Sequence, residues 1–291
     1  MFASRRAFGI LLILVSACSF GLMPIFGTWA YRDGVDTQGL LLVRFGVAGL
    51  VMLAIMLWRG ARWPRGRVLA GLALMGLAYT AQAFCYFSAL RYASAAMAAL
   101  LLYLYPVIVT VISALFLHER LRKRAMFALL LACVGLVLTI GNGAEGKLLG
   151  IAFGLATAFI YSGYILAGAK LTPKVGALPA ASVVMIAAAL ALWTSTLFAT
   201  PHWPQHGSGW LATGAIALVS TVVAIFTFLA GLDRLRAAEA STLSTLEPVV
   251  SVVLAACLLA EPLTALQWLG GAAILGAALL IALTPPLPAP E

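Results

Sequence analysis

The chain has 291 residues, of which 64% are hydrophobic and 9% are charged, and its mean hydropathy is +1.08. An ordinary soluble domain carries about 25% charged residues, so this composition excludes that class and predicts a polytopic membrane protein. The net charge of +9 could indicate a nucleic-acid partner, but most basic residues lie in short segments between apolar runs. We therefore expect no nucleic acid.

Ten apolar runs follow one another along the chain, each about long enough to cross ~30 Å of hydrocarbon as a helix. They are centred near residues 8–30, 38–58, 68–90, 94–117, 124–141, 149–169, 179–200, 210–230, 238–259 and 264–284. With the N-terminus inside, 14 of the 18 basic residues fall on the inner side, in agreement with the positive-inside rule. We expect a multi-pass protein of the plasma (bacterial inner) membrane, with both termini cytoplasmic and basic loops near lipid head groups.

One part of the sequence is present twice. Residues 90–121 match residues 232–263 at 13 of 32 positions with a constant offset of 142, whereas chance in a chain rich in Ala and Leu would match roughly a tenth. Equivalent stretches are separated by five spans, an odd number, so the two copies must cross the membrane in opposite directions. The sequence therefore predicts an all-α membrane protein of ten transmembrane helices, arranged as two inverted five-helix repeats around a central cavity.

The first repeat is expected at residues 1–141 and the second at residues 149–284. Residues 142–148 form a short outer connection that begins at a turn-forming Asn-Gly pair. Residues 285–291 are proline-rich and are expected to be a disordered tail.

Each copy has a proline within an apolar run, at Pro106 and at Pro248. A proline in a helix removes a backbone donor and frees the carbonyl four residues earlier, here those of Leu102 and Ser244. Such a carbonyl is tolerated in hydrocarbon only against protein or a water-filled cavity. Both helix kinks therefore indicate an interior space.

Arg44 lies near the start of the second run and is a charge within the membrane. Such a residue is a functional candidate. The alternative is that its side chain reaches outward to the lipid head groups, and this alternative is slightly favoured.

The third run has polar side chains at helical spacing. Tyr79, Gln82 and Tyr86 stand at i, i+3 and i+7, so they share one helix face, and an amide does not suit a lipid-facing position. This face is either a packed polar seam or one wall of a ligand cavity, and we favour the cavity. At the offset of 142, Tyr79 corresponds to Thr221. The other two positions correspond to smaller or less polar residues, so the cavity is not symmetric.

Glu247, directly before Pro248, is the one acid predicted deep within a span. It could couple transport to protons or cations, or bind a substrate amine. Alternatively, its carboxyl forms hydrogen bonds with serines around the kink, and the sequence does not separate these interpretations.

His202 and His206 lie four residues apart in an outer loop, a spacing that could indicate a metal site. Pro204 between them disfavours the helix that would align them, and no carboxylate or cysteine is near in sequence. The four cysteines are far apart within apolar runs and are expected to be packing residues. We therefore expect no metal and no cofactor.

The whole pattern resembles the EamA-like family of the drug/metabolite transporter superfamily. The resemblance rests on these stretches: Ala89-Leu90-Arg91-Tyr92-Ala93-Ser94-Ala95, Tyr105-Pro106, Glu247-Pro248, Glu119-Arg120-Leu121, Glu261-Pro262-Leu263, Tyr161-Ser162-Gly163-Tyr164 and Arg44. The chain departs from the family at Phe20, where a tryptophan is frequent, and at Tyr105, where an acid is common. The resemblance implies a central substrate cavity, for which the candidates are Phe20, Tyr79, Gln82, Tyr86, Tyr105, Tyr161, Tyr164 and Glu247.

The resemblance also implies a secondary transporter that exports amino acids or other small metabolites by alternating access. The alternatives are a channel or facilitator without coupling and a non-catalytic integral membrane protein. An enzyme is not expected, because the sequence lacks paired intramembrane carboxylates, a His-rich cluster and a nucleophile with a nearby base. The expected partners are a small-molecule substrate and membrane lipids, with proton or cation coupling left open.

Overall fold

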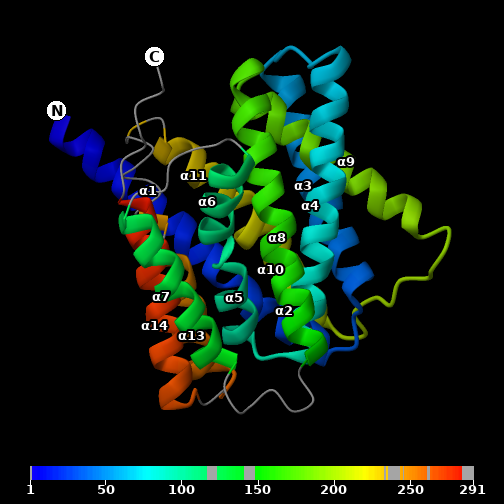
Figure 1. The fold of residues 1–291 in the computed structure, drawn as a ribbon. Coiled ribbons are helices and arrows are strands. Elements are labelled where there is room, and N and C mark those ends of the chain that lie inside the picture. Colours follow the sequence, from blue (N-terminus) through cyan, green and yellow to red (C-terminus); the bar gives the residue numbers. More distant parts are fainter. Residues whose placement is uncertain are drawn as a thin grey trace.

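A computed structural model describes residues 2–116, 123–140, 148–232, 234, 243–244, 246–260 and 263–283. In this part of the chain the secondary structure is helical and contains no strand (Figure 1). Four of the predicted features lie outside the described residues: Glu119, Glu261, most of the connection at 142–148 and the tail at 285–291.

The described part of the first half contains seven helices. They are α1 (Phe2–Gly21), α2 (Met23–Arg32), α3 (Thr37–Trp58), α4 (Gly66–Tyr92), α5 (Ala95–Leu102), α6 (Tyr105–Phe116) and α7 (Lys123–Ile140). Two of them begin at side chains that cap the helix. Asp36 accepts a hydrogen bond from the Gly39 N–H before α3, and Ser94 accepts one from the Met97 N–H before α5.

The second half contains α8 (Leu148–Leu171), the 3₁₀ turn η2 (Thr172–Lys174), α9 (Ala177–Ser195), α10 (Gly207–Ala217), the π-helical segment η3 (Leu218–Val223), α11 (Ala224–Leu232), α13 (Leu246–Leu258) and α14 (Ala265–Ala282). Each apolar run of the sequence overlaps one helix or two or three consecutive helical elements of the two halves. Within the described ranges, six helical stretches are long and apolar enough to cross a membrane, and four shorter apolar helices accompany them. The protein is therefore an all-α, multi-pass membrane protein.

Long helices from the two halves pack side by side. α4 lies along α8 and α9, α3 lies along α9, and α1 lies along α11, whereas α7 and α14 form a neighbouring pair (Figure 1). The main core contains Phe45 and Phe87, both fully buried. Large apolar side chains also cover the outside, such as Phe198 at 90% and Leu211 at 77% exposure. An outer surface of this kind suits hydrocarbon rather than water.

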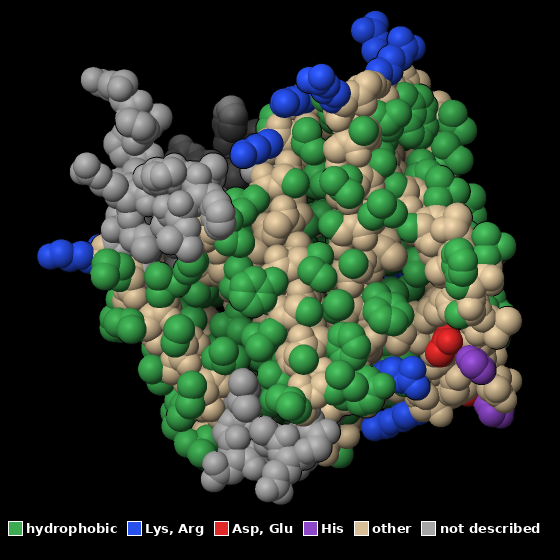
Figure 2. All heavy atoms as spheres, turned by 45° about the vertical axis from the view of Figure 1, so that its right-hand side comes forward, with side chains coloured by type: hydrophobic (Ala, Val, Ile, Leu, Met, Phe, Trp, Pro, Cys, Tyr) green, Lys and Arg blue, Asp and Glu red, His purple; other side chains and the backbone are tan. Residues whose placement is uncertain are grey.

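Charged side chains gather at the ends of the bundle, as Figure 2 shows. The connection between α3 and α4 carries Arg59, Arg62 and Arg65, all exposed, and Arg67 follows in the first turn of α4. The connection from α8 to α9 carries Lys174 at the same end of the molecule (Figure 1). Lysine and arginine side chains therefore cluster beyond one edge of the apolar surface.

Among the described residues, three helical stretches are interrupted. α1 gives way to α2 at Leu22, α5 gives way to α6 at Tyr103 and Leu104, and η3 separates α10 from α11. Pro106 is the second residue of α6, so the predicted kink is here a two-residue break. Interrupted helices free backbone groups, which within a membrane must face protein or a cavity.

Candidate functional site

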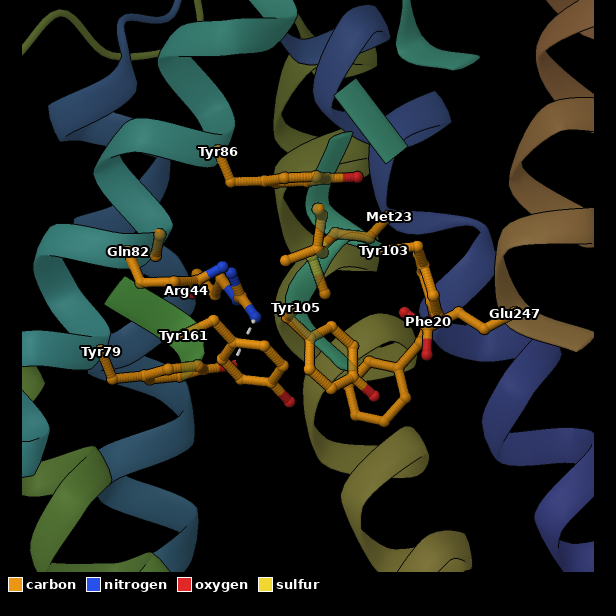
Figure 3. A pocket seen from close by; sticks show the side chains of 12 residues that line it. Phe20, Met23, Arg44, Tyr79, Gln82, Tyr86, Tyr103, Tyr105, Tyr161 and Glu247 are labelled. Carbon is orange, nitrogen blue, oxygen red and sulfur yellow. Dashed lines mark hydrogen bonds between the residues drawn. The ribbon is translucent and has the colours of Figure 1, made fainter. Parts of the chain in front are cut away.

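A cavity of about 120 Å³ lies beside two of these interruptions, those between α1 and α2 and between α5 and α6 (Figure 3). Its lining comes from α1, α2, α3, α4, α5, α6, α8 and α13, so both halves of the chain contribute. The lining residues are Phe20, Met23, Arg44, Tyr79, Gln82, Ala83, Tyr86, Leu102, Tyr103, Tyr105, Tyr161 and Glu247.

The structure brings seven of the eight candidate residues to this cavity. The exception is Tyr164, which lies behind the wall. Its ring stacks on Tyr161 with centroids 5.8 Å apart and lies 5.2 Å from the ring of Tyr79. Sequence reasoning did not place Met23, Ala83, Leu102 or Tyr103 in the site.

The helix stripe Tyr79, Gln82 and Tyr86 faces the cavity along α4. Gln82 is only 6% exposed, so its amide lies inside the bundle rather than against lipid. The period of an α-helix explains this result, because residues at i, i+3 and i+7 share one face whatever the rest of the chain does.

Aromatic rings form a connected wall around the cavity. Tyr105 meets Tyr161 edge to face with ring centroids 4.9 Å apart, and Tyr103 lies 5.9 Å from Tyr105. Aromatic contacts of this kind fix ring positions, and the phenol groups add polar atoms to an otherwise apolar lining. Such a wall suits a small amphipathic molecule.

Arg44 lies inside the protein and is only 3% exposed. Its Nε donates a hydrogen bond to the hydroxyl of Thr221 at 3.1 Å, and one terminal nitrogen donates to the hydroxyl of Tyr79 at 3.3 Å (Figure 3). The favoured expectation that this side chain reaches the outer head groups is therefore wrong. Two hydroxyl acceptors and nearby aromatic rings hold the guanidinium at the cavity instead.

Glu247 lies in the first turn of α13 and lines the cavity on the side opposite Arg44 (Figure 3). Its carboxyl group is a hydrogen-bond partner of the Tyr103 hydroxyl. Ser251 is one of the serines around the kink that were expected to form hydrogen bonds with the carboxyl group. It instead donates a hydrogen bond to the carbonyl oxygen of Gly21 at 3.0 Å. That carbonyl stands at the break between α1 and α2, so Ser251 stabilises the interruption.

The two histidines of the outer loop contact carboxylates that are remote from them in sequence. His206 Nδ1 lies 2.7 Å from Asp33 Oδ1, and His202 Nδ1 lies 3.3 Å from Asp36 Oδ2. The His206 backbone N–H also donates to Asp33 and is the main reason why the pKa of that carboxyl is lowered. Among the described residues, no three His, Cys, Asp or Glu side chains are grouped as metal ligands would be.

The fold and cavity define a multi-pass membrane protein with a small polar and aromatic site enclosed by interrupted helices. Residues 7–141 and residues 148–283 each match the model of the EamA-like transporter family. The chain therefore belongs to the EamA-like transporter family.

Several relatives match most of this chain, and one matches a little over half of it. It is 27% identical to the uncharacterized transporter YcbK of Bacillus subtilis, over 91% of this chain and 90% of that protein. It is also 27% identical to the uncharacterized inner membrane transporter YedA of Escherichia coli K12, over 91% of this chain and 89% of that protein. The aromatic amino acid exporter YddG of Ancylobacter novellus is 32% identical over 59% of this chain and 61% of its own length.

A solved crystal structure has the same fold. It superposes with a TM-score of 0.65 at 25% identity and covers 94% of this chain and 95% of that one. The family and the names of the relatives are those of transporters rather than enzymes.

Proposed function

We propose that the protein is a secondary transporter of the inner membrane that exports small metabolites such as amino acids by alternating access. The observation that carries the proposal is the cavity, because helices of both halves enclose it, the interrupted stretches α1–α2 and α5–α6 line it, and polar groups face it. Interrupted helices around a central binding site are the architecture of many secondary transporters. The relative named as an aromatic amino acid exporter supports the choice of substrate class.

The alternating step follows from a proposed internal symmetry. We infer that residues 1–141 and 149–284 are inverted repeats of five transmembrane helices each. The constant offset between residues 90–121 and 232–263 and the separate family match of each half support this division. In the proposed orientation both termini and the basic loops are cytoplasmic, and the two Asp–His contacts lie outside.

Glu247 is the proposed coupling group. It is the one carboxyl group among the lining residues, and its partner Tyr103 is a neutral hydroxyl rather than a base. A carboxyl that faces a cavity in the membrane can exchange a proton or bind a cationic group as access alternates. The second candidate function, a facilitator without coupling, is favoured only if this carboxyl has a purely structural role.

Counterflow in proteoliposomes tests the function. Vesicles loaded with unlabelled L-phenylalanine should accumulate labelled L-phenylalanine, because a carrier exchanges substrate faster than it completes a net cycle. Protein-free vesicles are the control, and the other standard amino acids are then offered as competitors. Flux without stimulation by internal substrate would identify a channel, and no flux for any amino acid would refute the proposed substrate class.

Glu247→Gln tests the coupling separately. The variant should still bind substrate and still perform counterflow, but an imposed pH gradient should no longer drive net transport. Unchanged pH-driven transport by this variant would reject Glu247 as the coupling group while leaving the carrier function intact.

A further inference from the structure

Arg44 is a buried positive charge whose contacts with the described residues are all neutral. It lies about two turns into α3 and is 3% exposed. Its two hydrogen bonds go to the hydroxyls of Thr221 and Tyr79. The rings of Phe45 and Phe87 lie 5.1 Å and 5.6 Å from the guanidinium carbon. Rings and hydroxyls stabilise a cation, but they do not neutralise it.

Glu247, the one acidic residue that lines the cavity, does not contact Arg44 and has another partner. Glu247 lies across the cavity from Arg44 (Figure 3), where its carboxyl meets Tyr103. A guanidinium has five N–H donors, and two of those on Arg44 are used in the described contacts. Donors therefore remain at a cavity wall that Arg44 itself lines.

The remaining donors fit one kind of ligand group. A guanidinium binds a carboxylate through two parallel hydrogen bonds, and these are stronger than hydrogen bonds between neutral groups. Arg44 is the one basic residue among the lining residues, so the site suits a single negative charge rather than a polyanion such as a phosphate ester. Aromatic side chains occupy much of the remaining wall and suit an apolar body attached to that charge.

Thr221 fixes the orientation of the Arg44 guanidinium at the cavity wall. Its hydroxyl donates to the carbonyl of Ile216, five residues earlier, at 3.0 Å, and this leaves its oxygen free to accept from Arg44. Hydroxyl groups in α-helices bond three or four residues back, so the wider π turn of η3 is what allows this contact. π turns of this kind occur frequently at functional sites.

Tyr79, the other residue that accepts a hydrogen bond from Arg44, is the repeat equivalent of Thr221. Positions 79 and 221 are related by the offset of 142, and both hydroxyls bond the same guanidinium. The side chain therefore stands at the junction of the two halves, with one contact to each. A ligand bound to Arg44 would lie at that junction.

We propose that Arg44 is the carboxylate-binding group of the cavity and that Thr221 positions it. The assignment rests on the proposed function of this cavity as a substrate site. It predicts a ligand with one carboxylate next to an apolar or aromatic body. Removal of the carboxylate from such a ligand should weaken binding more than any change to its ring.

Calorimetric titration of the purified full-length protein in detergent tests the assignment with three probes of equal ring and different charge. L-Phenylalanine carries a carboxylate and an ammonium group, 3-phenylpropanoate carries the carboxylate alone, and 2-phenylethylamine carries the ammonium alone. The two carboxylate probes should bind the wild-type protein more tightly than the amine. In Arg44→Gln their affinity should fall about 10- to 100-fold, while that of the amine should not fall.

The Thr221 variants keep the charge in place. Thr221→Val should weaken the carboxylate probes by roughly 3- to 10-fold, because one hydrogen bond that orients the guanidinium is lost. Thr221→Ser keeps the hydroxyl and should restore binding. Thr213→Val is the matched control, because this buried hydroxyl on α10 has no hydrogen-bond partner among the described residues. It should leave the affinities for all three probes unchanged.

Three results would overturn the assignment. They are equal binding of the amine and L-phenylalanine to the wild-type protein, a retained carboxylate preference in a folded Arg44→Gln variant, and no binding of either carboxylate probe. If Arg44→Gln does not fold, the Thr221→Val and Thr221→Ser pair decides. Carboxylate-selective binding without any counterflow would instead refute the proposed transport function and leave the assignment standing.

Discussion

Replacement of Glu247 should separate its hydrogen-bonding role from its charge. Its carboxyl is a partner of the Tyr103 hydroxyl, and the Tyr103 side chain is only 7% exposed. Glu247→Leu removes the acceptor and leaves a buried hydroxyl unpaired. This should lower the free energy of unfolding by about 1–3 kcal/mol. Glu247→Gln retains a side-chain oxygen as acceptor, so its stability should stay close to that of the wild type.

A double-mutant cycle with Tyr103→Phe assigns the loss to this one contact. Once the hydroxyl is removed, Glu247→Leu no longer leaves an unpaired group. The double variant should therefore be more stable than the sum of the two single changes predicts. Thermal unfolding in one detergent, followed by the fluorescence of the seven tryptophans, supplies the comparison.

Two results would refute the reasoning. If Glu247→Leu is as stable as the wild type, the contact with Tyr103 contributes nothing to the fold. If Glu247→Gln loses as much stability as Glu247→Leu, the charge or proton of the carboxyl matters rather than its ability to accept a hydrogen bond.

Three further outcomes are expected. The pKa of Asp33 is lowered, chiefly by the His206 N–H. The contact therefore stabilises the protein above about pH 4, and this stabilisation is lost as the pH falls through the lowered pKa. Asp33→Asn should flatten the acid end of a plot of thermal midpoint against pH. A Cβ at Gly135 would lie 2.7 Å from a backbone oxygen of α14. Gly135→Ala should therefore lower the free energy of unfolding by about 1–3 kcal/mol in the same assay. Gly214 has open space around it, so Gly214→Ala should not destabilise the protein. A cysteine at Gln205, which is exposed, should react with an impermeant reagent added to intact cells; protection there would reverse the proposed orientation.

Local periodicity was sufficient to predict some elements of the site. The stripe Tyr79, Gln82 and Tyr86 needs only the geometry of one helix, and its three residues line the cavity. The offset of 142 likewise directed attention to Pro106 and Pro248 without any knowledge of packing. Patterns within one helix or one repeat are visible in the sequence because they do not depend on distant parts of the chain.

Contacts between distant segments could not be predicted in this way. Arg44 was expected to reach the head groups because its acceptor Thr221 is 177 residues further along the chain. The partner of His206 is separated from it by 173 residues, so the sequence near the loop contains no sign of this carboxylate. The π turn that directs Thr221 leaves no separate signal in an apolar run. Each of these features arises only when the two halves pack together.

The polar contacts between the halves suggest how the proposed rocking motion would proceed. Asp33 with His206 joins the halves at the end opposite the basic loops, and Arg44 with Thr221 joins them at the cavity. The His206 side chain is 77% exposed and the Asp33 side chain is 8% exposed, so water can replace the contact from the histidine side when that end opens. The Arg44 contact is buried, and its loss without a replacement would leave a charge unsatisfied. A carboxylate ligand would supply that replacement. The two halves would therefore separate at the cavity more easily with substrate bound than without it.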